Sequence, residues 1–389
     1  MVEINKENVK GFKDFTGLEA LKREAIKKIL VEKFKVYGFN PAETPLIEFE
    51  KFVKGENTND EAISDIFKLK DRGERELALR YEFTFQLKRL VIGKKLPFRR
   101  YQIGEVFRDE PISSNRFRQF TQCDVDIIGS TIKDDAEVLK VFSEVLRELK
   151  IEAIVLINNR KLLNEILENE GIKDKFIKEQ VIREIDKLDK LKENEVKENL
   201  SKYNAEKIVT ILKKPEKYFE KYETFKEIQE LKKFCLMFGL KIEFSPFLAR
   251  GLSYYTGSIF EIRTKEFKES IAGGGSYQVN NIQSTGISFG LERLSNLAKI
   301  EAEGIKCILI SLGQDKTAIK ICQGLREEGV SCFVMEKLSK ALDYANQEKI
   351  PFVIFIGNEE IKKKKFKLRN MKSGKEEFFT ERELLKKLK

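Results

Sequence analysis

The sequence predicts an α+β fold in which a domain built on an antiparallel sheet is interrupted by a helical insertion and followed by a smaller α/β domain. Residues 98–129 alternate in the manner of two antiparallel strands joined by the polar loop EPISSNR. From about 159 to 240, Lys and Glu dominate, glycine nearly vanishes and apolar residues recur at helical spacing. From residue 305 onward, apolar strands alternate with helices, which is typical of a small, mainly parallel α/β domain.

These changes in pattern divide the 389 residues into four segments. We expect the first part of the main domain at 1–158, the helical insertion at 159–240, the second part of the main domain at 241–304 and the final α/β domain at 305–389. A chain of this length can form two or three domains, each with its own core.

The first half of the main domain combines helices with strands. Residues 17–37 place apolar side chains on one helical stripe and predict a helix that ends at Gly38. NPAETPLIEFE then predicts a turn and a strand, because its two prolines are poor residues for a helix interior. Residues 76–93 begin like a strand and become helical from about Thr84. A helix at 134–150 and the strand IEAIVLIN follow the hairpin.

Strands return after the insertion. KIEFSPFLARGLSYYTGSIFEIRT predicts extended chain, AGGGSY a glycine-rich turn, and TGISFGLERLSNLAKI a strand that runs into a helix. In the final domain, CILISLG, VSCFVME and PFVIFIG predict strands, with helices at 315–328 and 337–347 between them. The segment NEEIKKKKFKLRNMKSGKEEFF predicts a basic turn and then a hairpin.

The composition excludes several kinds of chemistry. The chain contains no histidine, which rules out Ser-His-Asp hydrolysis, histidine general bases and histidine-bound zinc. Its five cysteines lie far apart without a C-x-x-C pair, so we expect no zinc site and, with no secretory leader, reduced thiols in the cytosol. No apolar stretch reaches the roughly 18–20 residues that span a bilayer. The formal net charge of +10 favours partners with phosphate backbones, such as RNA.

The clearest local pattern for a binding site is the hairpin and its loop. Arg108 and Glu110 end the first strand, and Arg116 and Arg118 lie in or after the loop. Arginine beside a carboxylate at the mouth of a hairpin suits an adenine nucleotide, because a guanidinium neutralises phosphate charge and Glu110 can accept from an exocyclic amine. The alternative is an ordinary hairpin with solvated ion pairs.

The return strand carries a second set of polar residues. Gln122, Asp124 and Asp126 alternate along it and would therefore point into one cavity.

Three further segments carry candidate residues. In ARGLSYYTGSIFEI, Arg250 precedes Tyr254 and Tyr255, which must face opposite sides if the segment is extended. The glycines of AGGGSY would let backbone approach a ligand closely. In FGLERL, Arg293 opens a helix after a strand. The alternatives are buried aromatics in a sheet, a tight turn and a solvated Glu-Arg pair.

Taken in order, these segments resemble a class II aminoacyl-tRNA synthetase, and specifically the histidyl-tRNA synthetase family of the archaeal or eukaryotic type. The resemblance runs from about Gly11 to the C-terminus. GFKDFTGLEALKREAIKKILVEKFKVYGFNPAETPLIE resembles motif 1, VFRDE…NRFRQFTQCDVDIIG motif 2 and GISFGLERL motif 3. LALRYEFT, LARGLSYYTGSIFE and AGGGSY resemble the histidine-specific elements.

The resemblance implies a role for each matching residue on the ATP side. Arg108 would bind the α-phosphate, Glu110 the adenine and Arg116 the outer phosphates. Arg293 would hold the γ-phosphate side, and Arg250 would be an additional catalytic cation. Arg250 stands where other class II enzymes use a metal ion, while Mg²⁺ still accompanies ATP.

The resemblance also implies a histidine pocket made by Glu82, Thr84, Gln122, Asp126, Tyr254 and Tyr255. The first two would bind the α-ammonium group and Gln122 the carboxylate. Asp126, together with one or the other tyrosine, would bind the imidazole.

The family further implies an ATP-dependent ligase of protein biosynthesis that acts in the cytoplasm on tRNA(His), as a homodimer formed through motif 1. Residues 305–389 resemble its anticodon-binding domain, where Lys362 to Lys365 either form a solvated face or contact tRNA phosphates. Some positions depart from the family pattern: Ser253, Ser276 and Gln278 replace residues that are often Asp, Arg and Asp, and Thr121 replaces an aromatic or His. These departures predict a less acidic histidine site.

Three rival interpretations remain. They are the regulatory subunit of ATP phosphoribosyltransferase, a sensor that binds uncharged tRNA without catalysis, and another synthetase of the same subclass. The first lacks the final domain and the catalytic arginines, whereas this chain has Arg108, Arg250 and Arg293.

Overall fold

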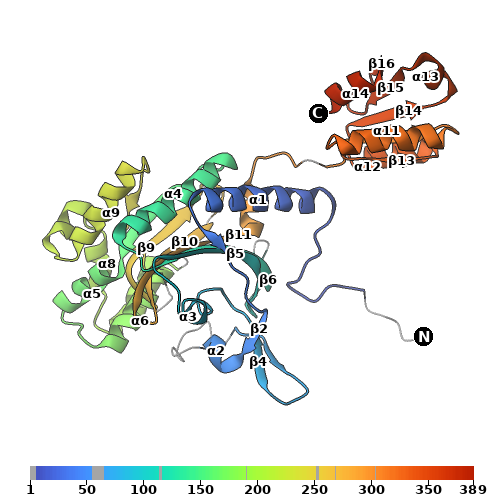
Figure 1. Ribbon diagram of the computed structural model, residues 1–389. Coiled ribbons are helices and arrows are strands. Elements are labelled where there is room, and N and C mark those ends of the chain that lie inside the picture. Colours follow the sequence, from blue (N-terminus) through green and yellow to red (C-terminus); the bar gives the residue numbers. More distant parts are fainter. Residues whose placement is uncertain are drawn as a thin grey trace. The chain divides into compact units, whose positions relative to one another are not determined.

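The computed structural model describes residues 6–54, 65–113, 116–189, 191–250, 254–267, 269–302 and 304–389 (Figure 1). These residues form two compact units, which are described separately. The first contains Met1–Asp14 and Ile26–Ile300, and the second contains Phe15–Ala25 and Glu301–Lys389. Ser253 lies outside the described residues.

The first unit is built on an eight-stranded sheet in the order β1-β5-β6-β11-β10-β9-β7-β8. β1 pairs with β5 and β7 with β8 in parallel, and the other neighbours are antiparallel. The strands are β1 (Asn40–Pro41), β5 (Phe98–Phe107), β6 (Gln119–Ile128), β7 (Ile154–Asn159), β8 (Glu243–Phe244), β9 (Tyr255–Arg263), β10 (Ala272–Val279) and β11 (Ile282–Gly290). The predicted hairpin of 98–129 is confirmed as β5 and β6.

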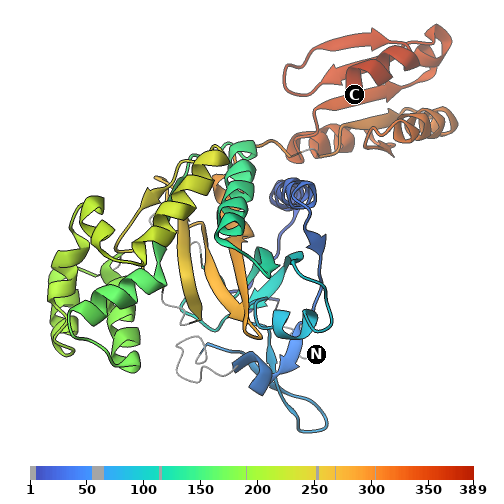
Figure 2. The ribbon, with the colours of Figure 1, turned by 60° about the vertical axis from the view of Figure 1, so that its left-hand side comes forward.

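Helices cover one face of this sheet. The later part of α1 (Gly17–Val36) and α4 (Ile132–Glu148) lie on it (Figures 1 and 2). The Phe142 ring of α4 stacks on Phe289 of β11 at 4.0 Å between centroids, and on Phe34 of α1 at 6.0 Å. The alternate residues of β6, Val125 and Ile127, are fully buried in the same core. The other face of the sheet is therefore the one on which polar side chains can gather.

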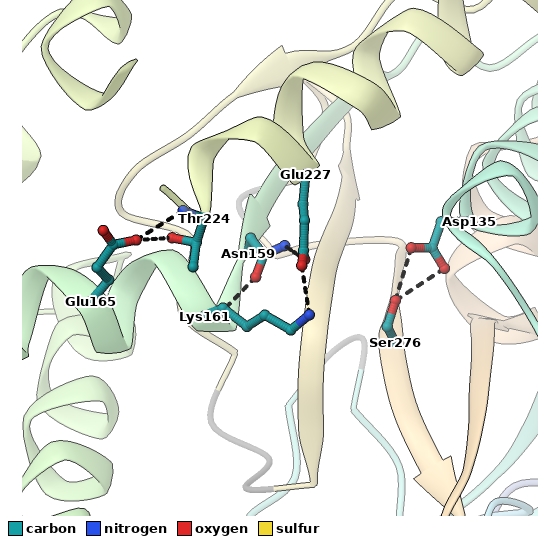
Figure 3. Close-up of polar contacts among 7 residues, drawn as sticks. All are labelled: Asp135, Asn159, Lys161, Glu165, Thr224, Glu227 and Ser276. Carbon is teal, nitrogen blue, oxygen red and sulfur yellow. Dashed lines mark hydrogen bonds and ion pairs between the residues drawn. The ribbon is translucent and has the colours of Figure 1, made fainter. Parts of the chain in front are cut away.

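The segment after β7 is helical, as predicted. It contains α5 (Arg160–Asn169), α6 (Lys175–Asp186), η2 (Lys187–Asp189), α7 (Glu193–Ser201), α8 (Lys207–Leu212), η3 (Glu216–Lys221) and α9 (Phe225–Met237). Figure 3 shows how polar groups join α5 to α9: Glu165 accepts from the backbone N–H of Thr224 at 2.9 Å, and Glu227 accepts from Asn159 at 2.8 Å and Lys161 at 2.6 Å. These contacts hold the first and last helices of the segment together.

A second, smaller sheet was not predicted. It has the order β2-β4-β3, with β2 at Ile47–Phe49, β3 at Lys68–Lys70 and β4 at Glu76–Leu79. The short helix α2 (Glu50–Lys54) lies between β2 and β3 in sequence, and α3 (Leu87–Leu90) follows β4. The helix expected from about Thr84 therefore begins three residues later and spans a single turn.

The second unit contains a five-stranded sheet in the order β13-β12-β14-β15-β16. The first three strands of that order are parallel and β15 and β16 form an antiparallel hairpin, as predicted. Its elements are β12 (Cys307–Ser311), α11 (Asp315–Glu327), β13 (Cys332–Met335), α12 (Leu338–Gln347), β14 (Phe352–Ile356), α13 (Asn358–Lys363), β15 (Phe366–Asn370), β16 (Glu376–Phe379) and α14 (Glu381–Leu388).

The prediction of a basic turn in this unit is wrong in one respect. The lysine run begins inside α13, at whose start the Glu360 carboxylate accepts a hydrogen bond from the backbone N–H of Gly357 at 3.1 Å. Lys364 ends the helix in the left-handed conformation, with φ of 49°. Lysine is a good helix former, so four lysines in a row do not by themselves predict a turn.

None of the helices in the described ranges combines the length and apolar composition needed to cross a membrane. All five cysteines are described, are buried and form no disulfide.

A buried carboxyl between α4 and the sheet gives the first unit a pH-dependent stability. Asp135 is 2% exposed, and the Ser276 hydroxyl donates to its two oxygens at 2.8 and 3.0 Å (Figure 3). Burial raises the pKa of Asp135 to about 6, although hydrogen bonds from Thr285, Ser258 and Ser276 lower it. The folded protein therefore keeps a proton that the unfolded chain loses above about pH 4.

Because the folded state binds this extra proton, the contribution of Asp135 to the free energy of unfolding falls as pH rises from about 4 to 6, by about 3 kcal/mol. We expect Asp135→Asn to gain stability relative to the wild type over this range. Denaturant unfolding of both proteins at pH 4 to 7 measures the difference. The control is Glu152→Gln, an exposed carboxyl of the same unit. Parallel pH profiles for Asp135→Asn and the wild type would contradict the prediction.

Candidate active site

The register of the central strands brings polar residues into rows on the face away from α4. Residues opposite one another on β5, β6 and β11 form three rows: Arg100–Asp126–Gly286, Gln102–Asp124–Ser288 and Gly104–Gln122–Gly290. Side chains of alternate residues share one face of a strand, so these rows lie on one surface. The prediction that Gln122, Asp124 and Asp126 face the same way is confirmed.

The glycines at the start of β10 leave this part of the strand without side chains. The sequence predicted a turn here, and that prediction is wrong. AGGGSY forms the first six residues of β10, which pairs with β9 on one side and β11 on the other, and not a turn. A Cβ on Gly273 would lie 2.5 Å from Cζ of Arg250, and a Cβ on Gly275 would lie 2.5 Å from the carbonyl oxygen of Ser258. Glycine in a strand interior marks such close approaches. The absent side chain of Gly273 makes room for the guanidinium of Arg250.

Arg108 is held at the end of β5 by two aromatic rings. Its guanidinium carbon lies 4.2 Å from the ring centre of Tyr81 and 5.1 Å from that of Phe120. Its Nε donates to the carbonyl oxygen of Tyr81 at 3.3 Å. Cation–π contacts of this kind fix a guanidinium without neutralising it.

Two more arginines lie near Arg108. Arg116 forms an ion pair with Glu110, and Arg293 of α10 (Leu291–Leu297) donates to the carbonyl oxygen of Ser270 at 2.6 Å. Burial lowers the pKa of Arg293, and the positive charges of Arg116 and Arg108 lower it further. The three guanidinium groups therefore repel one another, and an anion with several charges would relieve that repulsion.

The acidic half of the site is buried. Glu82 is 5% exposed, and burial raises its pKa to about 7, while Arg108 and a hydrogen bond with Thr84 lower it. Its Oε1 has no hydrogen-bond partner among the described residues. Gln122 donates to the Ser288 hydroxyl at 3.1 Å. A buried carboxylate oxygen without a donor suits a ligand that brings N–H groups.

Three tyrosines lie together near these acidic residues. The rings of Tyr254 and Tyr255 are 4.7 Å apart, and Tyr254 lies 5.8 Å from Tyr277. The expectation that Tyr254 and Tyr255 face opposite sides depended on extended chain at both positions, and it is wrong. β9 begins at Tyr255, so Tyr254 lies in a turn before the strand and the two rings can meet.

Arg250 lies beside the same strands. It adopts a left-handed conformation, with φ of 54°, and its guanidinium is 3.6 Å from the carboxylate of Glu261 on β9. Residues with side chains seldom adopt this conformation outside functional sites or turns.

Ser276 and Gln278, the two residues of β10 that depart from the family pattern, do not face this site. Ser276 points to Asp135 under α4, and Gln278 is exposed, whereas Tyr277 between them donates to Asp126. The expected loss of acidity therefore does not arise at these two positions. Thr121 donates its backbone N–H to Glu292 at 3.1 Å.

Sequence reasoning gave no role to several residues of this surface. They are Arg100, Gln102, Tyr277 and Ser288, all of which are aligned on the rows or contact them. Alternation of polar residues along FRRYQ was the available signal for Arg100 and Gln102. Among the described residues, no group of three or more acidic or cysteine side chains is arranged to hold a metal ion.

Comparison with known proteins identifies the family of the chain. Residues 11–294 match the family model described as histidyl-tRNA synthetase, and residues 306–389 match one described as anticodon binding domain. Histidine--tRNA ligase 1 of Bacillus cereus is 35% identical over 410 residues, which cover 95% of this chain and 96% of that protein. A histidine--tRNA ligase of Helicobacter pylori is 32% identical over 424 residues, with 95% of each chain covered.

Solved structures show the same fold. The histidyl-tRNA synthetase of Nostoc has a TM-score of 0.86 at 24% identity, with 99% of each chain covered. A protein of Bacillus halodurans described as ATP phosphoribosyltransferase regulatory subunit/histidyl-tRNA synthetase has a TM-score of 0.75 at 21% identity, covering 91% of this chain and 99% of that chain. These likenesses confirm the predicted fold class of an α+β core with a C-terminal α/β domain.

The expected archaeal or eukaryotic type stays a prediction, since the two sequence relatives come from Bacillus and Helicobacter. The family model covers most of the chain, and both relatives match it over nearly its whole length. The chain therefore belongs to the histidyl-tRNA synthetase family.

Proposed function

We propose that the chain activates histidine with ATP to histidyl-adenylate and transfers the histidyl group to the 3′ end of tRNA(His). The observation that carries the proposal is the charge arrangement of one sheet surface. Arg108, Arg116 and Arg293 gather at one side, and the buried acids Glu82 and Asp126 lie at the other. An ATP triphosphate fits the first half, and an amino acid with a cationic ammonium group fits the second.

In the first step, the carboxylate of histidine attacks the α-phosphorus of ATP in line. The new bond joins a carboxylate oxygen to phosphorus, and the bond to pyrophosphate breaks. Arg108 and Arg250 would stabilise the charge on the α-phosphate, while Arg116 and Arg293 hold the outer phosphates and Glu110 accepts from the adenine amine. The nucleophile is already ionised, so positioning and electrostatics suffice without a protein base.

In the second step, a hydroxyl of the terminal ribose of tRNA attacks the carbonyl carbon of the adenylate and AMP leaves. Residues 306–389 match an anticodon binding domain, which supports tRNA as the partner. The segments 1–158, 159–240, 241–304 and 305–389 are proposed as the two parts of the catalytic core, the insertion and this domain.

Histidine would be held at both ends. Glu82 and Thr84 would bind its α-ammonium group and Gln122 its carboxylate. Asp126 with Tyr254 or Tyr255 would bind the imidazole, whose two nitrogens both form hydrogen bonds. A site built to pair such nitrogens rejects apolar analogues strongly, so no editing domain is needed.

Magnesium would enter with the ATP phosphates. Glu292, which precedes Arg293 in sequence, accepts the backbone N–H of Thr121 with both carboxylate oxygens, and among the described residues no group of three or more acidic or cysteine side chains forms a separate site for the ion. We assign no step to it. Action in the cytoplasm, independence of zinc and a homodimer formed through motif 1 complete the proposal.

The test is ATP–pyrophosphate exchange with each amino acid, followed by aminoacylation of tRNA(His). We expect exchange with histidine at least about 10⁴-fold above exchange with apolar amino acids. An apolar amino acid would leave the buried polar groups of the site without hydrogen-bond partners, and this lowers its rate by about that factor. Exchange with another amino acid would indicate a different synthetase. Binding of tRNA without exchange would indicate the sensor, and the absence of both would favour a regulatory subunit.

A further inference from the structure

The largest of the fully buried side chains among the described residues is an arginine. Arg100 lies on β5 directly opposite Asp126 of β6, and its side chain is 1% exposed. Its Nη2 is 2.6 Å from Oδ2 of Asp126 and donates to the carbonyl oxygen of Phe83 at 3.2 Å. A guanidinium is seldom buried completely unless it is paired.

The charge of Arg100 acts on three buried carboxyls, of which Glu82 is also affected, more strongly, by Arg108. Burial raises the pKa of Asp126, of Asp124 to about 7 and of Glu82 to about 7, and the charge of Arg100 lowers all three. Asp126 also faces Asp124 on its own strand, Glu82 on the chain after β4, and the hydroxyl of Tyr277 on β10, which donates to its Oδ1. Its neighbour on β11 is Gly286, which adds no charge.

The contacts of Arg100 are not those expected of a residue that serves only to stabilise the fold. Its Nε and Nη1 have no hydrogen-bond partner among the described residues. Buried donors without partners cost free energy, and a buried ion pair is often no more stable than well-packed apolar residues of similar volume. A role in the chemistry of the site explains why an arginine stands here.

We propose that Arg100 is a positioning residue that holds Asp126 ionised and oriented as the acceptor for an imidazole N–H of histidine. The inference rests on the proposed function. Arg100 forms an ion pair with Oδ2 of Asp126, and Tyr277 donates to Oδ1, so both oxygens have a fixed polar neighbour. Among the described residues Oδ2 accepts no hydrogen bond, so it can still accept one from a ligand. A carboxylate has about four acceptor positions, so two remain for a ligand. A protonated Asp126 would lose acceptor capacity where the imidazole needs it.

The neighbouring arginine of the same strand provides a matched control. Arg99 points to the opposite face, where it pairs with Glu137 of α4 at 2.8 Å. Replacing Arg99 removes a guanidinium from β5 without touching the pocket.

The experiment measures kcat/KM for histidine and KM for ATP by pyrophosphate exchange between pH 6 and 9, in the wild type, Arg100→Leu, Arg100→Lys and Arg99→Met. We expect Arg100→Leu to lower kcat/KM for histidine about 100-fold at pH 7. The acidic limb of its profile should move up by about one pH unit or more, because Asp126 without Arg100 ionises at higher pH. KM for ATP should change less than about twofold.

Arg100→Lys keeps the positive charge but loses the planar guanidinium group. We therefore expect kcat/KM for histidine to fall about tenfold, while the acidic limb of the pH profile stays where it is in the wild type. Arg99→Met should behave like the wild type. The inference is overturned if Arg100→Leu keeps the wild-type acidic limb and kcat/KM for histidine and only unfolds at a lower temperature.

A double variant covers the case in which Arg100→Leu does not fold. Arg100→Leu/Asp126→Asn carries no uncompensated charge in this pair, and we expect it to fold and to equal Asp126→Asn in kcat/KM for histidine. A further loss of about 100-fold in the double variant would show that Arg100 acts independently of Asp126, against the inference. Absence of histidine-dependent exchange in the wild type would instead refute the proposed function and this inference with it.

Discussion

Replacing Arg108 by alanine should lower the rate of histidine-dependent pyrophosphate exchange by about 10³-fold while the protein stays folded. Removal of one preorganised group that meets developing charge typically costs 10²–10³-fold, and removal of an arginine from a phosphoryl-transfer site costs 10³-fold or more. Arg108 is half-buried and held between the rings of Tyr81 and Phe120, so it is already in place before the substrate binds. A loss of this size corresponds to about 4 kcal/mol of transition-state stabilisation.

The fold should survive because the printed contacts of Arg108 with described residues are to two aromatic rings and one backbone carbonyl, and Glu82, whose pKa Arg108 lowers, can take up a proton when the guanidinium is removed. Unfolding temperature and exchange rate are measured together, with Arg147→Ala, an exposed arginine on α4, as the control. Arg108→Lys should recover part of the rate, since lysine supplies charge without the bidentate fork. Exchange by Arg108→Ala within about tenfold of the wild type would remove Arg108 from the proposed phosphate site.

The parts of the fold that the sequence predicts are those held by local patterns. In the hairpin of β5 and β6, polar and apolar residues alternate along two neighbouring segments of the sequence. In the second unit, apolar residues recur at the spacing of a strand or a helix within each element. The strands β2 and β4 lie in segments that were expected to be extended, but β3 and the pairing of the three strands into a sheet were not predicted. β3 has three residues, too few to show a clear alternation.

The candidate site was predictable only where a known family supplied the roles. The pairing of Gln122 with Ser288 joins residues 166 positions apart, and no local pattern specifies such a register. Arg100 was missed for a different reason, since composition and period both favour an exposed arginine and burial arises from the packing of distant segments. The turn expected at AGGGSY failed because glycine lowers strand propensity in general, while in β10 it is the only residue that fits.

Gly274 tests that last point most directly. Gly274→Ala should destabilise the first unit by about 4 kcal/mol or more, or abolish soluble expression, because its Cβ would overlap the carbonyl oxygen of Gly286 and lie 2.7 Å from Cα of Ile287. Both atoms belong to the backbone of β11, which is hydrogen-bonded to β10 along its length, so neither strand can move without breaking the sheet. Overpacking against a mobile side chain costs only about 1–3 kcal/mol.

Gly290→Ala is the matched control, since a Cβ at this position of β11 would meet nothing within 4 Å. We expect it to change the free energy of unfolding by less than about 1 kcal/mol. Denaturant unfolding of both variants and the wild type measures the difference. If Gly274→Ala unfolds at the wild-type denaturant concentration, β10 and β11 cannot pair as described, and AGGGSY would again be the turn that its composition suggests. If it fails to fold while Gly290→Ala is stable, close approach of two backbones is the reason for glycine at Gly274.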